Sequence, residues 1–64
     1  MKKKIKVWET TEVVTILASD EEGTYRIIWH RSDGEADEEF DVTPGPDDSV
    51  EDAVAKDLRA RLGP

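Results

Sequence analysis

The 64-residue sequence contains no cysteine, no asparagine and no glutamine, and its only methionine is Met1. Without cysteine, disulfide frameworks, cysteine-ligated zinc and thiol nucleophiles are excluded. A single histidine excludes metal sites that need two. No apolar run approaches the length of a membrane span, and the lysine-rich N-terminus lacks the apolar segment of a signal peptide. We therefore expect a cytoplasmic protein that does not contact membranes.

The joint absence of amides and cysteine has three explanations. Thermophilic proteins discard these thermolabile residues. Designed proteins avoid ambiguous polar groups and carry strongly charged surfaces. Chance in a short chain is the third explanation. The composition favours a de novo designed chain over a natural one, and in either of the first two cases it predicts a thermostable protein.

The charge is unbalanced, with 16 acidic and 9 basic side chains and a formal charge of −7. This charge argues against general binding to a phosphate backbone, so no nucleic-acid partner is expected. The first eight residues differ from the rest because they hold four lysines and no acid. Since Ile5 and Val7 interrupt the lysines, we expect this segment to dock as a strand rather than act as a nucleic-acid or lipid-binding arm.

The length predicts one small domain over residues 1–64. Strands are expected at residues 3–8, 12–19, 24–31 and 35–42, with turns at residues 20–23 and 33–34. Pro44 and Pro46 end the sheet. A helix is predicted over Val50–Leu62, because Val50, Val54, Leu58 and Leu62 form one apolar stripe. Residues 47–49 supply N-cap candidates, and Gly63 followed by Pro64 predicts a left-handed C-terminal cap.

The Asp33-Gly34 dipeptide predicts a two-residue type I′ turn, which determines the register of the flanking strands. One face then holds Tyr25, Ile27, Trp29, Ala36, Phe40 and Val42, and the other holds Arg26, Ile28, His30, Asp37, Glu39 and Asp41. The register opposes Arg26 to Asp41 and His30 to Asp37, and it places Arg31 diagonal to Glu38. Because a slip of one residue would mix the apolar and charged faces, the separation supports this register.

The strand at residues 12–19 is apolar on both sides, since Val13 and Leu17 join Ile28 on the otherwise charged face. We expect a curled sheet that covers this face with its lysine-rich first strand, as in a small barrel. The alternative is an exposed Val13/Leu17/Ile28 patch that binds a partner. Trp8 shares a strand parity with three lysines and is the fourth candidate interaction residue. The predicted fold is thus α+β, a curled four-stranded antiparallel sheet packed by one C-terminal helix.

No catalytic, metal or cofactor site is predicted. His30 opposite Asp37 imitates half of a hydrolytic triad, but no nucleophile motif accompanies it, and a surface cross-strand pair is favoured. Acidic residues follow Asp33 at the spacing of a calcium-binding loop, yet Glu38 and Pro44 stand where that loop needs glycine and glutamate. The aromatic residues Tyr25, Trp29 and Phe40 are assigned to the core.

Over residues 12–62, the order of strand, turn, Tyr25–His30 strand, acidic turn, strand and helix resembles the chromodomain layout. Small-barrel archaeal chromatin proteins have a related architecture. The resemblance implies a binding module for a methyl-lysine peptide, in which Trp29 matches one cage aromatic by position. The chain has Phe40-Asp41-Val42 where that family has Trp-Glu-Pro.

The leading functional hypothesis is a stable, non-enzymatic small scaffold that is monomeric and has no cofactor. The first alternative is a protein-interaction module that uses the Val13/Leu17/Ile28 patch or Trp8, and a dimer through the same patch belongs to this alternative. The second alternative is an acidic DNA mimic that inhibits a nucleic-acid-binding protein through Glu35, Asp37 and Glu39. An enzyme ranks last because no constellation of catalytic residues is complete.

Overall fold

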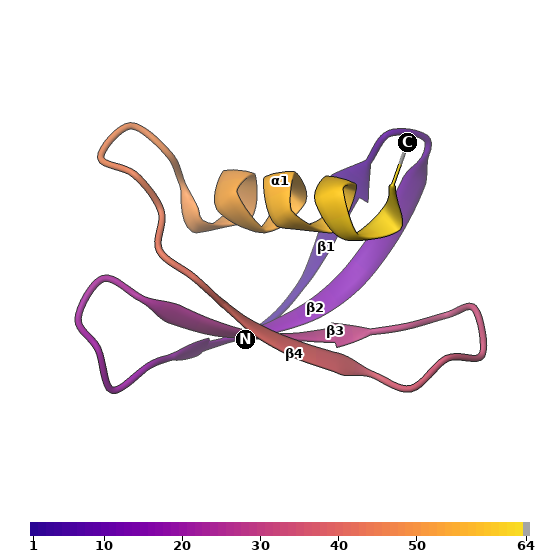
Figure 1. Cartoon of the computed structure of the whole chain (residues 1–64), viewed down its shortest axis with the longest axis horizontal. Helices are drawn as coiled ribbons and strands as arrows, with labels where there is room; N and C mark the ends of the chain where they lie inside the picture. Colours follow the sequence, from indigo (N-terminus) through magenta and orange to yellow (C-terminus); the bar gives the residue numbers. More distant parts are fainter. Residues whose placement is uncertain (64) are drawn as a thin grey trace.

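Four strands follow one another along the chain, and each pairs with its sequence neighbours. In the computed structural model, which describes residues 1–63, they are β1 (Lys2–Val7), β2 (Thr10–Ala18), β3 (Tyr25–His30) and β4 (Glu38–Val42). All pairings are antiparallel, and the sheet order is β1-β2-β3-β4. Helix α1 (Val50–Leu62) follows β4 (Figure 1). The predicted α+β fold with one C-terminal helix is confirmed.

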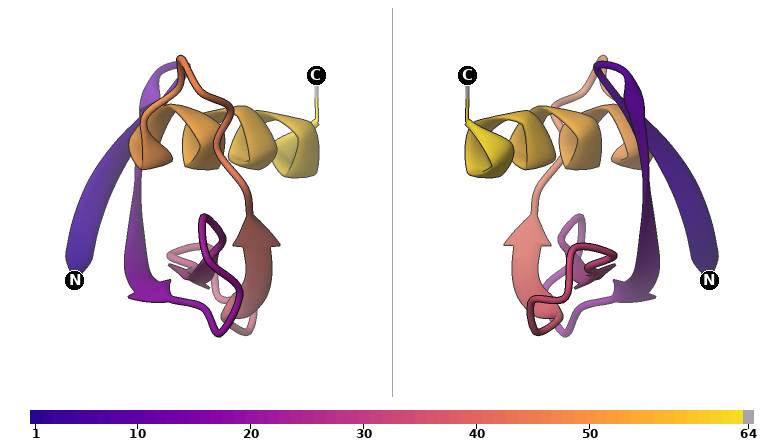
Figure 2. Two further views of the ribbon diagram at one scale, coloured as in Figure 1. Left: turned by 90° about the vertical axis from the view of Figure 1, so that its left-hand side faces the viewer. Right: turned by 90° about the vertical axis from the view of Figure 1, so that its right-hand side faces the viewer.

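The sheet is strongly curled, and α1 lies across its inner side (Figure 2). The helix packs against β1 and β4, which are the two edge strands of the sheet. These edge strands do not pair with each other, so the sheet is open and does not close into a barrel. The helix therefore bridges the two edge strands of the open sheet.

The core lies between the inner face of the sheet and α1, and it is built from alternate residues of each strand. Its buried members are Ile5, Val7, Val14, Ile27, Trp29, Phe40, Val42, Val54 and Leu58. Tyr25 is half-buried and packs against this cluster, so the three aromatic residues assigned to the core are confirmed there. Full burial of one such side chain contributes about 1.5–3 kcal/mol, which makes this cluster the main stabilising feature of a small domain.

The predicted β3–β4 register is confirmed, whereas the prediction of a two-residue turn between these strands is wrong. Ile27 pairs with Phe40 as predicted, but pairing ends at Trp29 and Glu38, and residues 31–37 form an open loop. A type I′ turn requires a positive φ at both central residues. Gly34 has a φ of 90°, but the φ of Asp33 is not positive. The predicted strand at residues 35–42 consequently begins at Glu38.

Side chains account for the open loop, because they bind the backbone groups that a tight hairpin would use in the strand ladder. The Asp33 carboxylate accepts the Glu35 N–H at 3.1 Å, and the Asp37 carboxylate accepts the Arg31 N–H at 3.2 Å. Such local bonds from aspartate compete with regular pairing.

The ends of the helix follow the predicted signals. Ser49 is the N-cap, and its hydroxyl accepts the Asp52 N–H at 3.1 Å. Gly63 has the expected positive φ of 77°, but its ψ of 171° is extended, so the cap is not of the left-handed helical type. Pro64 lies outside the described residues. Val54 and Leu58 are buried, whereas Leu62, the last residue of the predicted stripe, lies at the C-terminal end of α1 and is 38% exposed.

Candidate functional site

The predicted patch of Val13, Leu17 and Ile28 lies on the outer face of the sheet. Val13 pairs with His30, and Leu17 pairs with Arg26, so these residues share the face opposite the core. Leu17 is 42% exposed, and the other two are half-buried. The expectation that the first strand covers this face is wrong, because β1 pairs beside β2 and continues the sheet.

Trp8 is not part of that patch. Val7 pairs with Thr10, so Trp8 and Glu9 form the turn between β1 and β2, which are two separate strands. Trp8 has a φ of 53° and is 54% exposed. This turn removes Trp8 from the strand alternation that was expected to place it among the lysines, and its side chain borders a pocket at the C-terminal end of α1.

The charged outer face contains the predicted cross-strand pairs. Arg26 lies 3.5 Å from Asp41, and His30 Nδ1 lies 3.0 Å from Asp37 Oδ2. His30 Nε2 also lies 2.7 Å from the Thr15 hydroxyl, a contact that the sequence analysis missed. The cross-strand pairing of Val13 with His30 is the signal for it, since Thr15 is the next outer-facing residue along β2.

Thr15, His30 and Asp37 stand in the order of nucleophile, base and carboxylate. Acyl transfer also requires a substrate cleft and donors for an oxyanion. The groove and the pocket described below are lined by none of these three side chains. The Thr15–His30 hydrogen bond joins β2 to β3, and the His30–Asp37 contact joins β3 to the β3–β4 loop.

Two arginines lie over aromatic rings at the end of the sheet. The Arg31 guanidinium is 4.2 Å from the centre of the Trp29 ring, and the Arg61 guanidinium is 4.0 Å from that of Phe40. Both arginines bind Glu38, so the predicted Arg31–Glu38 contact is confirmed. The Arg61–Glu38 ion pair links the end of α1 to β4. Trp29, the cage residue implied by the chromodomain resemblance, is only 1% exposed beneath Arg31.

The charges of this cluster reinforce one another. The hydrogen bond with Asp33, aided by the one with Glu38, raises the pKa of Arg31. Hydrogen bonds from Arg31 and from the Glu35 N–H lower the pKa of Asp33. Asp33 is thus held as a carboxylate by groups of its own loop.

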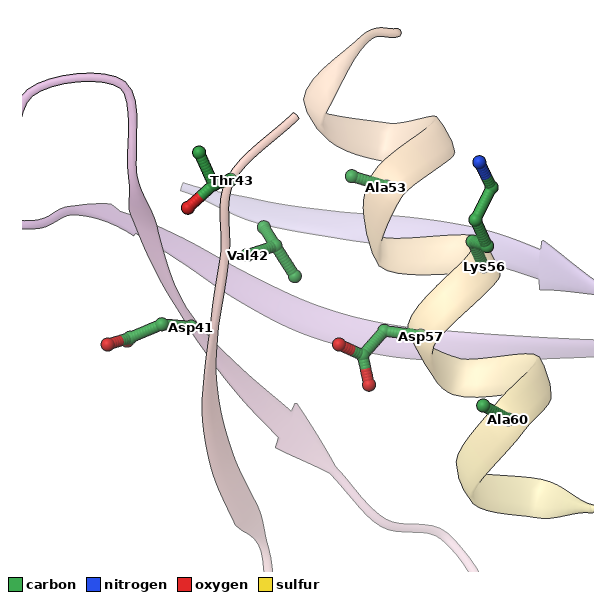
Figure 3. A pocket seen from close by; sticks show the side chains of 7 residues that line it. All are labelled: Asp41, Val42, Thr43, Ala53, Lys56, Asp57 and Ala60. Atoms are coloured by element: carbon green, nitrogen blue, oxygen red, sulfur yellow. The ribbon is translucent and has the colours of Figure 1, made fainter. Parts of the chain in front are cut away.

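A groove of about 420 Å³ separates the free edge of β4 from α1. Its lining comprises Asp41, Val42, Thr43, Ala53, Lys56, Asp57 and Ala60. Val42, Ala53 and Asp57 point into the space between strand and helix, whereas Asp41 and Lys56 point away from it (Figure 3). The groove is open because alanines occupy the helix positions beside the strand. The sequence analysis assigned no role to these alanines and therefore missed the groove.

A second pocket, of about 340 Å³, lies where the β1–β2 turn, the β3–β4 loop and the end of α1 converge. It is lined by Trp8, Thr10, Glu12, Trp29, Ser32, Asp33 and Leu62. Trp8 and Leu62 are two of the four large apolar residues that remain exposed in the described chain. We name this feature the Trp8 pocket.

Residues 1–63 contain no group of three or more histidine, aspartate or glutamate side chains placed to hold a metal ion. In the same part of the chain, no helix has both the length and the apolar character needed to cross a bilayer. The chain matches no protein-family model, and no curated protein or solved structure is significantly similar to it.

Proposed function

We propose that this chain is a small, non-enzymatic interaction domain that binds an extended, basic segment of another protein along the free edge of β4. The observation that carries the proposal is the groove beside that edge. Every second residue of an edge strand directs its N–H and C=O away from the sheet, where an added strand can pair with them. Binding by strand addition uses these groups for affinity and adjacent side-chain pockets for specificity.

The groove suits an added strand in polarity. Its apolar base includes Val42 and Ala53. On the helix side, Asp57 directs its carboxylate, which also accepts a hydrogen bond from Arg61 Nε at 2.7 Å, into the groove. On the outer face of β4, Glu39 flanks the same edge together with Asp41, which is also paired with Arg26. A strand with alternating apolar and basic residues would place its apolar side chains inward and its cations beside these carboxylates. The net charge of −7 favours the same class of partner.

A peptide with the sequence of residues 2–7, acetylated and amidated at its ends, is the first probe. It has four lysines alternating with or preceding Ile5 and Val7, and the same sequence forms a strand in this sheet. We expect its titration to shift the amide signals of residues 38–43 and 53–60, with an affinity that falls as salt rises. Shifts confined to β2 would contradict the proposal, because they would report replacement of β1 by the peptide.

Two controls test the mode of binding. N-methylation of alternate peptide amides removes the N–H donors and should abolish binding, while the charge is unchanged. Ala60→Trp fills the groove and should weaken binding at least tenfold, whereas Ala36→Trp in the exposed β3–β4 loop should leave it unchanged. Absence of binding by the unmodified peptide would overturn this function and favour the stable scaffold without a ligand.

A further inference from the structure

The backbone of Trp8 is strained without compensation from burial. A φ of 53° lies in the left-handed region, which is unfavourable for a bulky side chain. More than half of the side chain is exposed, so its packing does little to offset this backbone strain. The Thr10 hydroxyl donates to the Val7 carbonyl at 3.0 Å and braces the turn. The turn therefore holds an exposed indole beside a pocket, which is an arrangement typical of a binding site.

The Trp8 pocket offers one carboxylate that is not already neutralised. Glu12 is half-buried, and its Oε1 accepts the Trp29 indole N–H at 3.0 Å. Across residues 1–63, Glu12 forms no ion pair. The other carboxylate of the pocket, Asp33, is already paired with Arg31. Glu12 is thus the negative charge available to a ligand.

The protein already shows twice which group fits an aromatic ring beside a carboxylate. Arg31 lies over Trp29, Arg61 lies over Phe40, and both guanidinium groups also bind Glu38. Trp8 is the most exposed aromatic residue, and within residues 1–63 no cation lies over its ring. The Trp8 pocket thus contains an aromatic ring and a carboxylate but no internal guanidinium.

We infer that the Trp8 pocket binds a guanidinium group brought by a ligand. The planar cation stacks on the Trp8 ring, its N–H groups donate to Glu12, and the attached alkyl chain contacts Leu62. The ligand is therefore an arginine side chain or a free alkylguanidinium. The site does not depend on the β4 groove, because the two share no lining residue.

N-acetyl-arginine amide is the probe. The signals are the backbone amide resonances of Thr10, Glu12 and Leu62, which remain in every variant, and the indole N–H resonance of Trp8, assigned with Trp8→Phe. We expect saturable binding in about the millimolar range, as is usual for so small a ligand. N-acetyl-lysine amide should bind more weakly, since its ammonium is more strongly hydrated and cannot stack. Free arginine separates the two sources of guanidinium. Its carboxylate should weaken binding if the site is built for arginine within a peptide, and equal affinity would assign a free alkylguanidinium.

Variants localise the site. Trp8→Ala should weaken binding about fivefold or more, and Trp8→Phe, which retains a ring, should have a smaller effect. Glu12→Gln keeps an acceptor for the Trp29 indole but should weaken binding severalfold and remove most of its salt dependence. Leu17→Ala, on the outer face, is the matched control. Unchanged affinity in Trp8→Ala, or equal binding of N-acetyl-norleucine amide, would overturn the inference.

Discussion

On the inner face of the sheet, Val14, Ile27 and Phe40 are buried in one cluster with the helix, whereas Leu17 and Arg26 of the outer face remain exposed on the same strands. The inner face is stabilised by removal of apolar surface from water. The outer face is held by cross-strand ion pairs and hydrogen bonds, each worth about 0.2–1 kcal/mol. The difference shows that most of the folding free energy resides on one side, which leaves the other side and the rim available for binding.

The largest expected effect comes from opening the inner face. Leu58 is fully buried, so Leu58→Ala should cost about 2–5 kcal/mol in the free energy of unfolding, which is a large share of the stability of a small domain. Leu17→Ala removes the same atoms from the outer face and should cost about 0.5 kcal/mol or less. Urea unfolding measures both, and similar costs would contradict the contrast between the faces.

The helix that covers the inner face depends on its N-cap. Ser49→Ala removes the acceptor of the Asp52 N–H and should cost about 1 kcal/mol. Ser32→Ala is the control, because Ser32 lies in the open β3–β4 loop. Thermal unfolding followed by circular dichroism measures both variants. A loss no greater in Ser49→Ala than in Ser32→Ala would show that sheet contacts alone hold the helix.

Trp8 lies at the rim between the two faces, and its replacement should stabilise the domain, whereas most substitutions destabilise a protein. Glycine adopts a φ of 53° without strain, so Trp8→Gly should stabilise the domain by up to about 1 kcal/mol, after the greater freedom of glycine in the unfolded chain is subtracted. Trp29→Ala, within the core, should destabilise it strongly. Chemical denaturation distinguishes these outcomes, and a destabilised Trp8→Gly would show that the indole contributes to packing.

The smallest expected effect is the pH dependence that Asp33 gives to the stability of the domain. Because hydrogen bonds from Arg31 and the Glu35 N–H lower the pKa of Asp33 in the folded state, its stabilising contribution is present above the unfolded pKa of about 4. It is lost as the pH falls through the lowered folded value. Wild type should therefore be more stable than Asp33→Asn at pH 6, and the two should converge near pH 2. Urea midpoints at the two pH values test this, and a constant difference would contradict it.

Local signals were sufficient for much of the fold. Alternation of apolar residues placed the four strands, the stripe of valine and leucine placed the helix with its observed bounds, and residues 25–29 were paired correctly with residues 38–42. The register was correct although the turn was not, because the match of apolar and charged faces independently excludes a slip.

The candidate sites were less accessible to sequence reasoning. Trp8 was named as a candidate interaction residue, but its φ and its distance from the outer patch depend on how the first hairpin turns. The β4 groove depends on small side chains of α1 lying beside an edge strand 10 or more residues earlier in the chain. No local pattern encodes that juxtaposition.

The sequence by itself thus determined the elements, their order and the division of the sheet into an apolar and a charged face, since these depend on backbone preference and on periodicity within each segment. Only the tertiary structure decided that the sheet stays open, that α1 spans its two edges, and that Trp8, Glu12 and Leu62 meet around one pocket. These features arise from the curl of the whole sheet and from packing between distant segments, where small differences in side-chain volume determine which spaces are filled.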